Sequence, residues 1–293
     1  MIKKLRLQGK SAVVTGSGSF GIGRAIALGM AAEGAQVVIN DIGANPEGAR
    51  LADVVVKQIK DAGGIAVANY DSVASMAGGE NIIKTAVSAF GKIDILVNCA
   101  GVFKSMPTQN MTEKDWDLVM SVHLKGHFAC SKAAMVEMMK QKSGRILNFS
   151  SRGAFHGPPT PNPEYSCLAY NTAKAGILGF TTALASELKE QNVTVNAILP
   201  SAITTLFPYE KRPITDNIPV PAHTEPDYVV PIVIYLCSDE AAKITGKYFY
   251  SCGGDICLYG QPLQLPGPHM FMHKADKWTF EELSQIIPTM IIK

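Results

Sequence analysis

The stretch that decides the fold is residues 11–23, which read SAVVTGSGSFGIG. Its first part, Ser11–Thr15, is a short apolar run of the kind that forms a buried strand. Glycines follow at positions 16, 18, 21 and 23, and a helix-like stretch begins at Ile22. Glycines let the backbone turn sharply and approach a pyrophosphate, and the following helix N-terminus offers N–H groups to it. The stretch therefore predicts a strand–turn–helix unit, which either binds a dinucleotide or is a tight turn without a ligand.

The same alternation of short apolar runs and helix-like segments continues along the chain. Runs such as Val37–Ile39 and Ile95–Val97 are apolar on both faces, as a parallel strand between two layers of helices requires. The expected strands are Ser11–Thr15, Gln36–Asn40, Ile65–Tyr70, Ile93–Asn98, Arg145–Phe149, Thr194–Leu199 and Lys247–Ser251. The expected helices are Ile22–Glu33, Arg50–Ala62, Ser75–Phe90, one that starts at Thr112, Cys167–Gln191 and Glu225–Cys237. The sequence predicts an α/β fold, a single Rossmann-type doubly wound parallel sheet of seven strands with helices on both faces.

The alternation ends at Gly253-Gly254, which sets the expected domain boundary. Residues 1–254 should form the nucleotide-binding catalytic domain, and residues 255–293 a C-terminal tail that packs on its own or a neighbouring subunit. The tail carries a capping box, Thr279 with Glu282, which indicates a short helix. Residues 153–166 are rich in proline and predict an irregular loop.

Composition excludes several classes of protein. The chain has 293 residues, 47% of them hydrophobic, and a net charge of +2. This length suffices for one large core, and the lack of long Lys/Arg runs argues against nucleic-acid binding. No stretch is apolar for the roughly 18 residues that a membrane span needs. We therefore expect a soluble cytoplasmic protein with no membrane partner, no metal site and buried free cysteines.

An acidic residue, Asp41, follows the second predicted strand. A carboxylate here can accept hydrogen bonds from both hydroxyls of an adenosine ribose, and it would repel a 2′-phosphate. The glycine loop contains no basic residue that would attract that phosphate. The sequence therefore favours NAD over NADP. The alternative is that Asp41 only begins a turn before Gly43.

Tyr170 and Lys174 are four residues apart in a predicted helix, so both side chains lie on one face. An ammonium beside a phenol favours the phenolate and lowers the pKa of the phenol from about 10. Such a pair can exchange protons near neutral pH. Ser150 and Ser151 end the fifth strand, where a hydroxyl can hold a substrate oxygen. Taken alone, such a Tyr/Lys pair is more often a surface contact, and such serines are polar residues that end a strand.

In this order and spacing, these features resemble the short-chain dehydrogenase/reductase family over residues 8–254. The landmarks are the Thr15–Gly23 loop, Asp71, Asn98 to Gly101, Ser151, Tyr170 with Lys174, and Pro200 to Thr205. Within the family, the chain looks most like the (3R)-hydroxyacyl-CoA dehydrogenase domain of peroxisomal multifunctional enzymes and its bacterial relatives. The stretches that carry this narrower resemblance are Val38–Asp41, Ala66–Val73 and Val122–Gly126.

The resemblance implies an NAD-dependent alcohol dehydrogenase or ketone reductase that works by hydride transfer. Ser151, Tyr170 and Lys174 would be catalytic, with Tyr170 exchanging the proton while Ser151 hydrogen-bonds the carbonyl or alkoxide. The residues expected to contact the cofactor are Gly16, Ser19, Phe20, Gly21, Ile22, Gly23, Asp41, Asp71, Ser72, Asn98, Ala100, Gly101, Tyr170, Lys174, Pro200, Ile203 and Thr205.

The resemblance leaves the substrate and the assembly open. The narrower resemblance implies a secondary alcohol or ketone on a bulky substrate, with a 3-hydroxyacyl-CoA, a steroid and a cyclic alcohol as the candidates. Relatives are usually homodimers or homotetramers. The second functional hypothesis is a noncatalytic NAD-binding subunit or regulator.

The chain departs from the family pattern at three places. Four residues separate Gly16 from Gly21, one more than is usual in the family. His123 stands where an asparagine is usual on the central helix, and we expect it either to relay protons or to be a packed histidine. Ser151 and Tyr170 are nineteen residues apart, farther than is usual, because the proline-rich segment lies between them.

Overall fold

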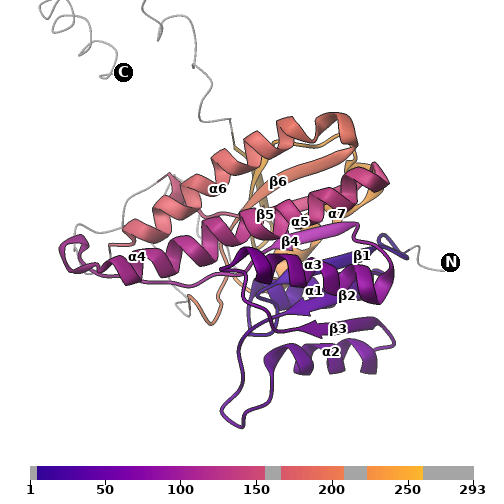
Figure 1. The fold of residues 1–293 in the computed structure, drawn as a ribbon, viewed down its shortest axis with the longest axis horizontal. Coiled ribbons are helices and arrows are strands. Elements are labelled where there is room, and N and C mark those ends of the chain that lie inside the picture. The colour runs from indigo at the N-terminus through magenta and orange to yellow at the C-terminus, as the bar shows by residue number, and fades with distance from the viewer. Residues whose placement is uncertain (1–4, 156–165, 208–222, 260–293) are drawn as a thin grey trace, which may run out of the picture. The chain divides into compact units, whose positions relative to one another are not determined.

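The computed structural model describes residues 5–155, 166–207 and 223–259. These residues form an eight-stranded sheet in the order β3-β2-β1-β4-β5-β6-β7-β8 (Figure 1). The strands are β1 (Ser11–Thr15), β2 (Gln36–Asn40), β3 (Ile65–Asn69), β4 (Ile95–Asn98), β5 (Gly144–Phe149), β6 (Val193–Pro200), β7 (Tyr248–Cys252) and β8 (Asp255–Leu258). Every neighbouring pair from β3 to β7 is parallel. The predicted doubly wound parallel sheet of β1 to β7 is confirmed.

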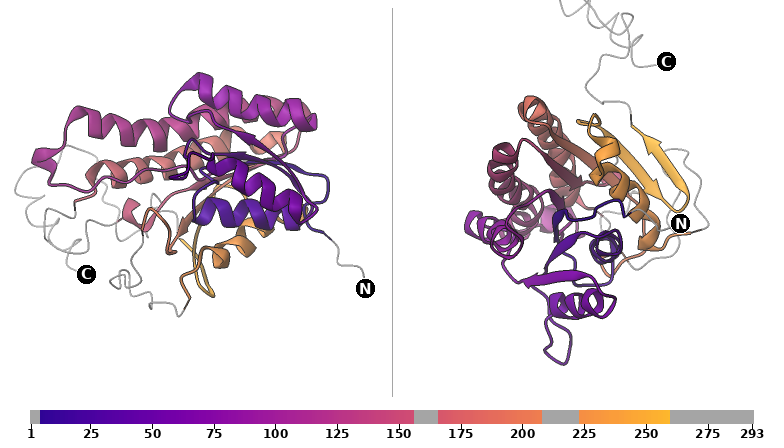
Figure 2. Two further views of the ribbon diagram at one scale, coloured as in Figure 1. Left: turned by 90° about the horizontal axis from the view of Figure 1, so that it is seen from below. Right: turned by 90° about the vertical axis from the view of Figure 1, so that its right-hand side faces the viewer.

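Helices cover both faces of the sheet (Figure 2). They are α1 (Ile22–Ala32), α2 (Leu51–Asp61), α3 (Met76–Phe90), α4 (Glu113–Met120), α5 (Gly126–Gln141), α6 (Leu168–Glu187) and α7 (Val230–Cys237). Successive strand residues point to opposite faces, so Val14 packs with α1, α2 and α7 while Val13 packs with α3, α5 and α6. None of the helices within the described ranges is long and apolar enough to cross a membrane.

The helix ends follow signals that the sequence contains. The Ser75 side chain accepts a hydrogen bond from Gly78 N at 3.0 Å and so caps α3. Thr112 Oγ1 accepts one from Asp115 N at 3.2 Å and caps α4. Gly91 ends α3 in the left-handed conformation, with φ of 78°. Local capping chemistry thus accounts for these boundaries.

Strand β8 adds one strand to the prediction. It pairs antiparallel with β7, with Cys252 opposite Asp255, so the sheet has eight strands rather than seven. The first residues after 254 therefore extend the sheet, while the expected division into a catalytic domain and a tail stays a prediction. β8 is only four residues long, and its residues do not alternate clearly between polar and apolar. The Gly253-Gly254 pair between β7 and β8 is nevertheless a two-residue hairpin signal, and not only the domain boundary expected from the sequence.

The prediction of a short helix near the C-terminus concerns residues that the structure does not describe. The chain divides into two compact units, residues 1–259 and 260–293. The second unit, with the predicted capping box, lies outside the described residues, as does most of the proline-rich segment. All six cysteines are free, but Cys257 on β8 is exposed, which corrects the expectation that all are buried.

Gly79 lies where α3 approaches α5 closely. A Cβ there would stand 2.7 Å from the backbone carbonyl carbon of Ala129. We predict that Gly79→Ala lowers the free energy of unfolding by about 1–3 kcal/mol, because the two helices must move apart.

Gly179 on α6 is the matched control, since nothing stands within 4 Å of a Cβ there. Gly179→Ala should leave the stability unchanged or raise it by up to roughly 1 kcal/mol, since alanine favours a helix. Urea unfolding measures both variants. Equal losses in the two would contradict the close approach of α3 and α5.

Candidate active site

A cavity of about 810 Å³ opens at the carboxyl ends of the central strands. It spans the point between β1 and β4 where the strand order reverses, the usual ligand site of such sheets. Most of the predicted site residues line it: Gly16, Ser19, Phe20, Gly21, Ile22, Gly23, Asp41, Asp71, Ser72, Ala100, Gly101, Ser151, Tyr170, Lys174, Pro200 and Thr205. The fold thus brings together residues up to 189 positions apart in the chain.

Two predicted cofactor contacts, Asn98 and Ile203, do not line the cavity. The buried amide of Asn98 donates to Ser131 Oγ at 3.0 Å and to Asn148 Oδ1 at 2.9 Å. The N–H of Ile203 donates to Thr224 O at 2.7 Å. These residues therefore join neighbouring elements, and the sequence could not show the direction in which they point.

The glycine loop is tight because backbone segments meet there. Gly16 has a φ of +65°, and a Cβ on it would stand 2.6 Å from Ala100 Cα. A Cβ on Gly23 would stand 2.3 Å from Gly16 O. Only glycine fits at these two positions, because the backbone of the loop lies directly against Ala100 and against its own first turn.

Asp41 holds the extended loop in place. One carboxylate oxygen accepts hydrogen bonds from Gly18 N at 2.8 Å and Ser19 N at 3.3 Å, and the other accepts from Gly43 N at 2.8 Å. A carboxylate has about four acceptor positions, so one remains for a ribose hydroxyl. The loop residues between Gly16 and Gly21 are thereby anchored on the side of β2.

Thr205 anchors the same loop from the other side. Its N–H and its Oγ1 both donate to Phe20 O, at 3.2 Å and 2.8 Å. Thr205 lines the cavity as predicted for a cofactor contact, but both of its donors are directed to the loop. The loop is therefore held between the segment after β6 and the end of β2.

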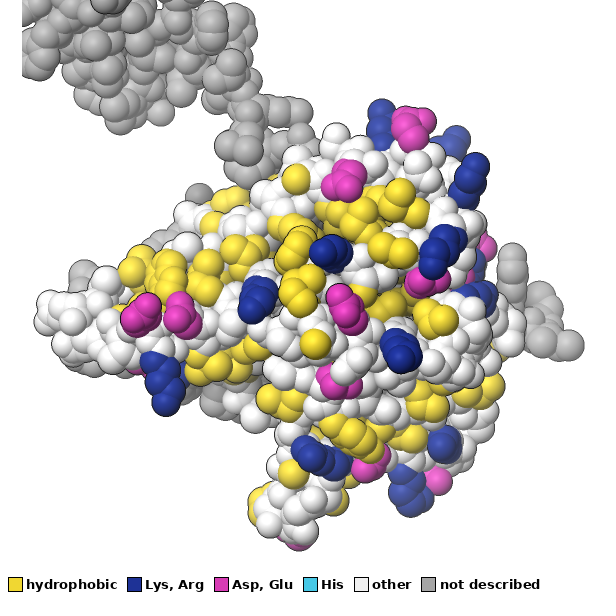
Figure 3. Space-filling view, viewed as in Figure 1, with side chains coloured by type: hydrophobic (Ala, Val, Ile, Leu, Met, Phe, Trp, Pro, Cys, Tyr) yellow, Lys and Arg dark blue, Asp and Glu magenta, His cyan; other side chains and the backbone are white. Residues whose placement is uncertain are grey.

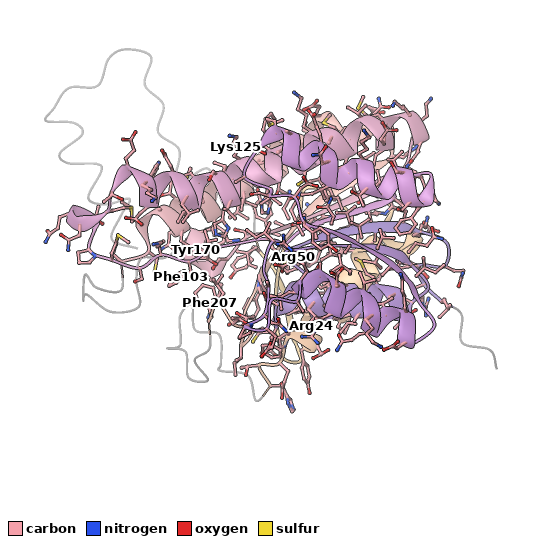
Figure 4. All side chains as sticks on the ribbon, turned by 60° about the horizontal axis from the view of Figure 1, so that its bottom comes forward. Arg24, Arg50, Phe103, Lys125, Tyr170 and Phe207 are labelled. Atoms are coloured by element: carbon pink, nitrogen blue, oxygen red, sulfur yellow. The ribbon has the colours of Figure 1, made fainter. Side chains whose placement is uncertain are left out.

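Tyr170 lies on α6 in an aromatic surround (Figure 4). Its ring meets Phe103 and Phe207 edge-on, with centroids 5.3 Å and 5.8 Å away. The side chain of Tyr170 is only 7% exposed. The sequence does not predict Phe103 or Phe207, because single aromatic residues in loops carry no pattern. They give the reacting hydroxyl a largely dry environment.

Lys174 lies one turn along α6 from Tyr170, with Nζ 5.5 Å from the centre of the tyrosine ring. Nζ donates to Phe149 O at 2.6 Å, which ties α6 to β5. Burial lowers the pKa of Lys174 to about 8, and the nearby Cys99 thiol opposes that effect. The ammonium is thus the main form at neutral pH, close to the phenol.

The structure separates the two serines that end β5. Ser150 Oγ donates to Lys174 O at 2.7 Å, so this hydroxyl fixes the helix. Ser151 Oγ accepts from Gly153 N at 3.1 Å and faces the same cavity as Tyr170. Of the two hydroxyls, that of Ser151 is therefore the one placed to meet a substrate oxygen.

His123 lies on a π-helical turn, Ser121–Lys125, between α4 and α5. Its Nε2 is 2.7 Å from Val102 O and 3.1 Å from Val102 N, and its ring meets that of Tyr170 edge-on at 5.3 Å. Burial and the charge of Lys174 hold the pKa of His123 well below its usual range. His123 is therefore a packed neutral histidine beside the active site, and a relay role stays a prediction.

Comparison with known proteins decides the family. Residues 17–255 match the family model described as Enoyl-(Acyl carrier protein) reductase. The 3-oxoacyl-[acyl-carrier-protein] reductase of Synechocystis sp. is 39% identical over 85% of this chain and 98% of its own length. The chain belongs to the short-chain dehydrogenase/reductase family. It is a dehydrogenase/reductase enzyme, and membership of the family implies a nicotinamide cofactor.

Other short-chain dehydrogenase/reductases share both fold and sequence with it. A short chain dehydrogenase from Mycobacterium avium superposes with a TM-score of 0.82 at 36% identity, covering 98% of this chain and 95% of that one. The peroxisomal multifunctional enzyme type 2 of Drosophila melanogaster is 40% identical over 86% of this chain. The peroxisomal hydratase-dehydrogenase-epimerase of Neurospora crassa is 39% identical over 87%. The chain spans only 40% and 27% of the lengths of these two proteins.

The described residues hold no group of three or more His, Cys, Asp or Glu side chains that could bind a metal ion.

Asp41→Asn tests the anchoring of the glycine loop. Hydrogen bonds to a charged acceptor contribute about 1.5–3 kcal/mol, and the amide keeps only one acceptor oxygen. We predict a loss of about 1–3 kcal/mol in the free energy of unfolding together with weaker NADH binding. The preference for NADH over NADPH should become smaller, because the charge that repels the 2′-phosphate is gone.

Asp61→Asn is the control for that variant. Asp61 forms an exposed i,i+4 pair with Lys57, which contributes about 0.3–0.5 kcal/mol. Urea unfolding and fluorescence titration of both nucleotides measure the effects. A fully stable Asp41→Asn protein would contradict the anchoring of the loop, and an undiminished preference for NADH would contradict the repulsion of the 2′-phosphate.

His127 on α5 gives the fold a pH dependence. Its Nδ1 lies 2.6 Å from His123 O, and burial lowers the pKa of His127 to about 3. In the unfolded chain, the pKa of His127 has its ordinary value of about 6.5. Below that pH the unfolded chain therefore binds a proton at His127 that the folded protein does not bind. The stability therefore falls as the pH drops below about 6.5, by about 2 kcal/mol between pH 7 and pH 5 from this group alone.

His127→Gln should remove that part of the pH dependence. The measurement is urea unfolding of the variant and the parent protein at pH 7 and pH 5. The slope against pH, rather than the absolute stability, is the readout, because the substitution also disturbs packing. An unchanged slope would mean that His127 is not held neutral in the folded protein.

Proposed function

We propose that this chain is an NAD-dependent oxidoreductase that interconverts a 3-hydroxyacyl and a 3-oxoacyl thioester. The observation that carries the proposal is the single cavity shared by Asp41, Ser151, Tyr170 and Lys174. Two relatives support the acyl substrate by their names, the 3-oxoacyl-[acyl-carrier-protein] reductase and the succinyl-CoA derivative dehydrogenase subunit of Thauera aromatica, which is 35% identical over 87% of this chain.

The residues present fit a nicotinamide dinucleotide. The cavity extends across the sheet from the ends of β2 and β3 to the ends of β5 and β6, and both Gly16 and Ala100 line it. Gly21 and Ile22 place the N-terminus of α1 at its wall, where N–H groups favour phosphate. Bound there, the cofactor supplies the hydride donor or acceptor.

The side chains of the site perform the proton chemistry. During reduction, the Tyr170 hydroxyl gives its proton to the carbonyl oxygen, and during oxidation the phenolate takes the proton of the alcohol. The Lys174 ammonium, fixed on Phe149 O, favours the phenolate. Ser151 donates a hydrogen bond to the substrate oxygen, and this hydrogen bond becomes stronger as negative charge develops on that oxygen. Phe103 and Phe207 exclude water from the exchange.

The preference for NAD rests on Asp41. Three backbone N–H groups fix its carboxylate, so it cannot rotate away from a 2′-phosphate. Placing two negative groups side by side is unfavourable, whereas a free ribose hydroxyl can donate to the carboxylate. NAD is therefore the proposed cofactor.

A steroid or cyclic alcohol is the second candidate substrate. Phe103 and Phe207 pack edge-on, with centroids 4.7 Å apart, and offer an apolar wall for a flat ring system. The noncatalytic subunit has no such support, because Ser151, Tyr170 and Lys174 are all present around one cavity.

The assembly is part of the proposal. Hydrophobic side chains gather on the face over α4, α5 and α6 (Figure 3), among them the exposed Phe128, Val136 and Met139 of α5 and Leu168 of α6. Apolar surface of this kind supports a homodimer or homotetramer. A cytoplasmic location stays a prediction from the sequence.

Tyr170→Phe tests the proposed function. With acetoacetyl-CoA and NADH, we predict that kcat falls by about 10²–10⁴-fold, because the proton donor is lost. The affinity for NADH should stay within about threefold, since the ring and its aromatic neighbours remain. Absorbance of NADH follows turnover, and its fluorescence reports binding.

Tyr235→Phe, at an exposed position on α7, is the control and should behave as the parent protein does. Near-normal turnover in Tyr170→Phe would overturn the assigned mechanism. A parent protein that reduces cyclic or steroid ketones but not acetoacetyl-CoA would favour the second candidate substrate.

A further inference from the structure

Arg152 shares a short turn with Ser151 at the end of β5. Ala154 N donates to Ser151 O at 3.0 Å, and Phe155 N donates to Arg152 O at 3.0 Å, which forms the 3-10 turn. Gly153 N donates to Ser151 Oγ at 3.1 Å. Both Ser151 and Arg152 line the cavity. The turn therefore fixes a guanidinium-bearing residue directly beside the proposed ligand of the reacting oxygen.

The guanidinium of Arg152 rests on the sheet. Its central carbon is 5.5 Å from the ring centre of Tyr250, a fully buried residue of β7. Burial raises the pKa of Tyr250, so this ring is a neutral phenol at physiological pH. A cation over an aromatic face is positioned without losing its charge. Tyr250 thus holds Arg152 on the β7 side of the cavity.

The other charged side chains of the cavity already have roles. Asp41 anchors the glycine loop, and Asp71 accepts hydrogen bonds from Asn69 and Asn81 on the side of β3. Lys174 supports the proton exchange. Arg152 is a further charged residue of the lining, and neither the cofactor contacts nor the proton exchange uses it. The acidic residues lie toward β2 and β3, and the two cations lie by β5 and α6.

We propose that Arg152 binds a carboxyl-derived oxygen of the substrate while its neighbour Ser151 holds the reacting oxygen. A guanidinium presents forked N–H donors that suit a thioester carbonyl or a carboxylate. Two consecutive residues on one turn can bind two oxygens of the same small molecule only if those oxygens are close together. A 3-hydroxyacyl or 3-oxoacyl group meets this requirement, because one carbon separates the two that carry oxygen.

This inference rests on the proposed oxidoreductase function and narrows it. It makes Arg152 a specificity-determining residue, which selects acyl substrates over steroids and simple ketones. The shared chemistry is the carboxyl-derived oxygen, and the source is either a thioester or a free acid. Substrates with the same four-carbon chain distinguish these sources.

The test compares three ketones, acetoacetyl-CoA, acetoacetate and 2-butanone, each reduced by NADH. Arg152→Met removes the charge but keeps an unbranched stem, and Arg152→Lys keeps the charge but loses the fork. We expect Arg152→Met to lower the ratio of kcat/KM for the acyl substrate to kcat/KM for 2-butanone by roughly 10- to 100-fold, mainly through KM. Arg152→Lys should recover part of that ratio.

The ketone for which the Arg152 variants lose kcat/KM identifies the source of the oxygen that Arg152 binds. A loss confined to acetoacetyl-CoA assigns the thioester carbonyl, and one confined to acetoacetate assigns a free carboxylate. Arg6→Met, at an exposed position that pairs with Glu240, is the control for the loss of one arginine and should leave the ratio unchanged. NADH affinity and thermal unfolding of each variant show whether the site is intact.

Equal losses with all three ketones would overturn the inference and leave a structural role through Tyr250. An unchanged ratio would overturn it as well. Neither result affects the proposed oxidoreductase, whose parent protein would still be active. A parent protein that reduces none of the three ketones, yet reduces a steroid or cyclic ketone, would instead contradict the acyl substrate and the role of Arg152 together.

Discussion

The hydrogen bond between Lys174 Nζ and Phe149 O is the interaction on which the rest of the site depends. A buried ammonium is strongly unfavourable without a partner, and this carbonyl supplies one at the end of β5. The bond joins α6 to β5, and so it sets Tyr170 on the helix opposite Ser151 at the strand end. Burial of the same group lowers the pKa of Lys174 to about 8, so the ammonium remains the main form at neutral pH. One contact thus supports both the geometry and the electrostatics of the proton exchange.

The extended glycine loop shows how a departure from a family pattern can be accommodated. Gly18 N and Ser19 N are directed to the Asp41 carboxylate, and Phe20 O receives both donors of Thr205. The additional residue is therefore absorbed by hydrogen bonds on either side of the cofactor cleft, and the N-terminus of α1 stays at the cavity wall. An acid that is expected to select a ribose also becomes part of the structure of the loop, so selectivity and stability are coupled at Asp41.

Much of the fold follows from the sequence, because valine- and isoleucine-rich runs between helix signals are hard to mistake for anything but buried parallel strands. β1 and β2 have the predicted bounds, whereas β8 lacks a clear period and is missing from the prediction, although Gly253-Gly254 before it is a hairpin signal. The proposed catalytic residues, Ser151, Tyr170 and Lys174, follow from spacing and resemblance. The sequence does not show where a side chain points. Asn98 ends a strand just as Asp41 follows one, but the Asn98 amide points to Ser131 and Asn148 rather than to the cavity. Nor does it show that Phe103, Phe207 and Arg152 meet around the site, since their separation along the chain carries no signal.

The glycine loop and Asp41 are proposed to form an NAD site that serves Tyr170. Titration of the purified protein with NADH, followed by nucleotide fluorescence and with NADPH titrated in parallel, tests this site directly. We expect saturable binding of NADH and much weaker binding of NADPH, because the anchored carboxylate repels the 2′-phosphate. Tighter binding of NADPH would contradict the role of Asp41. Binding of neither nucleotide would mean that the loop held by Asp41 and Thr205 closes the cleft, and the proposed oxidoreductase would be wrong.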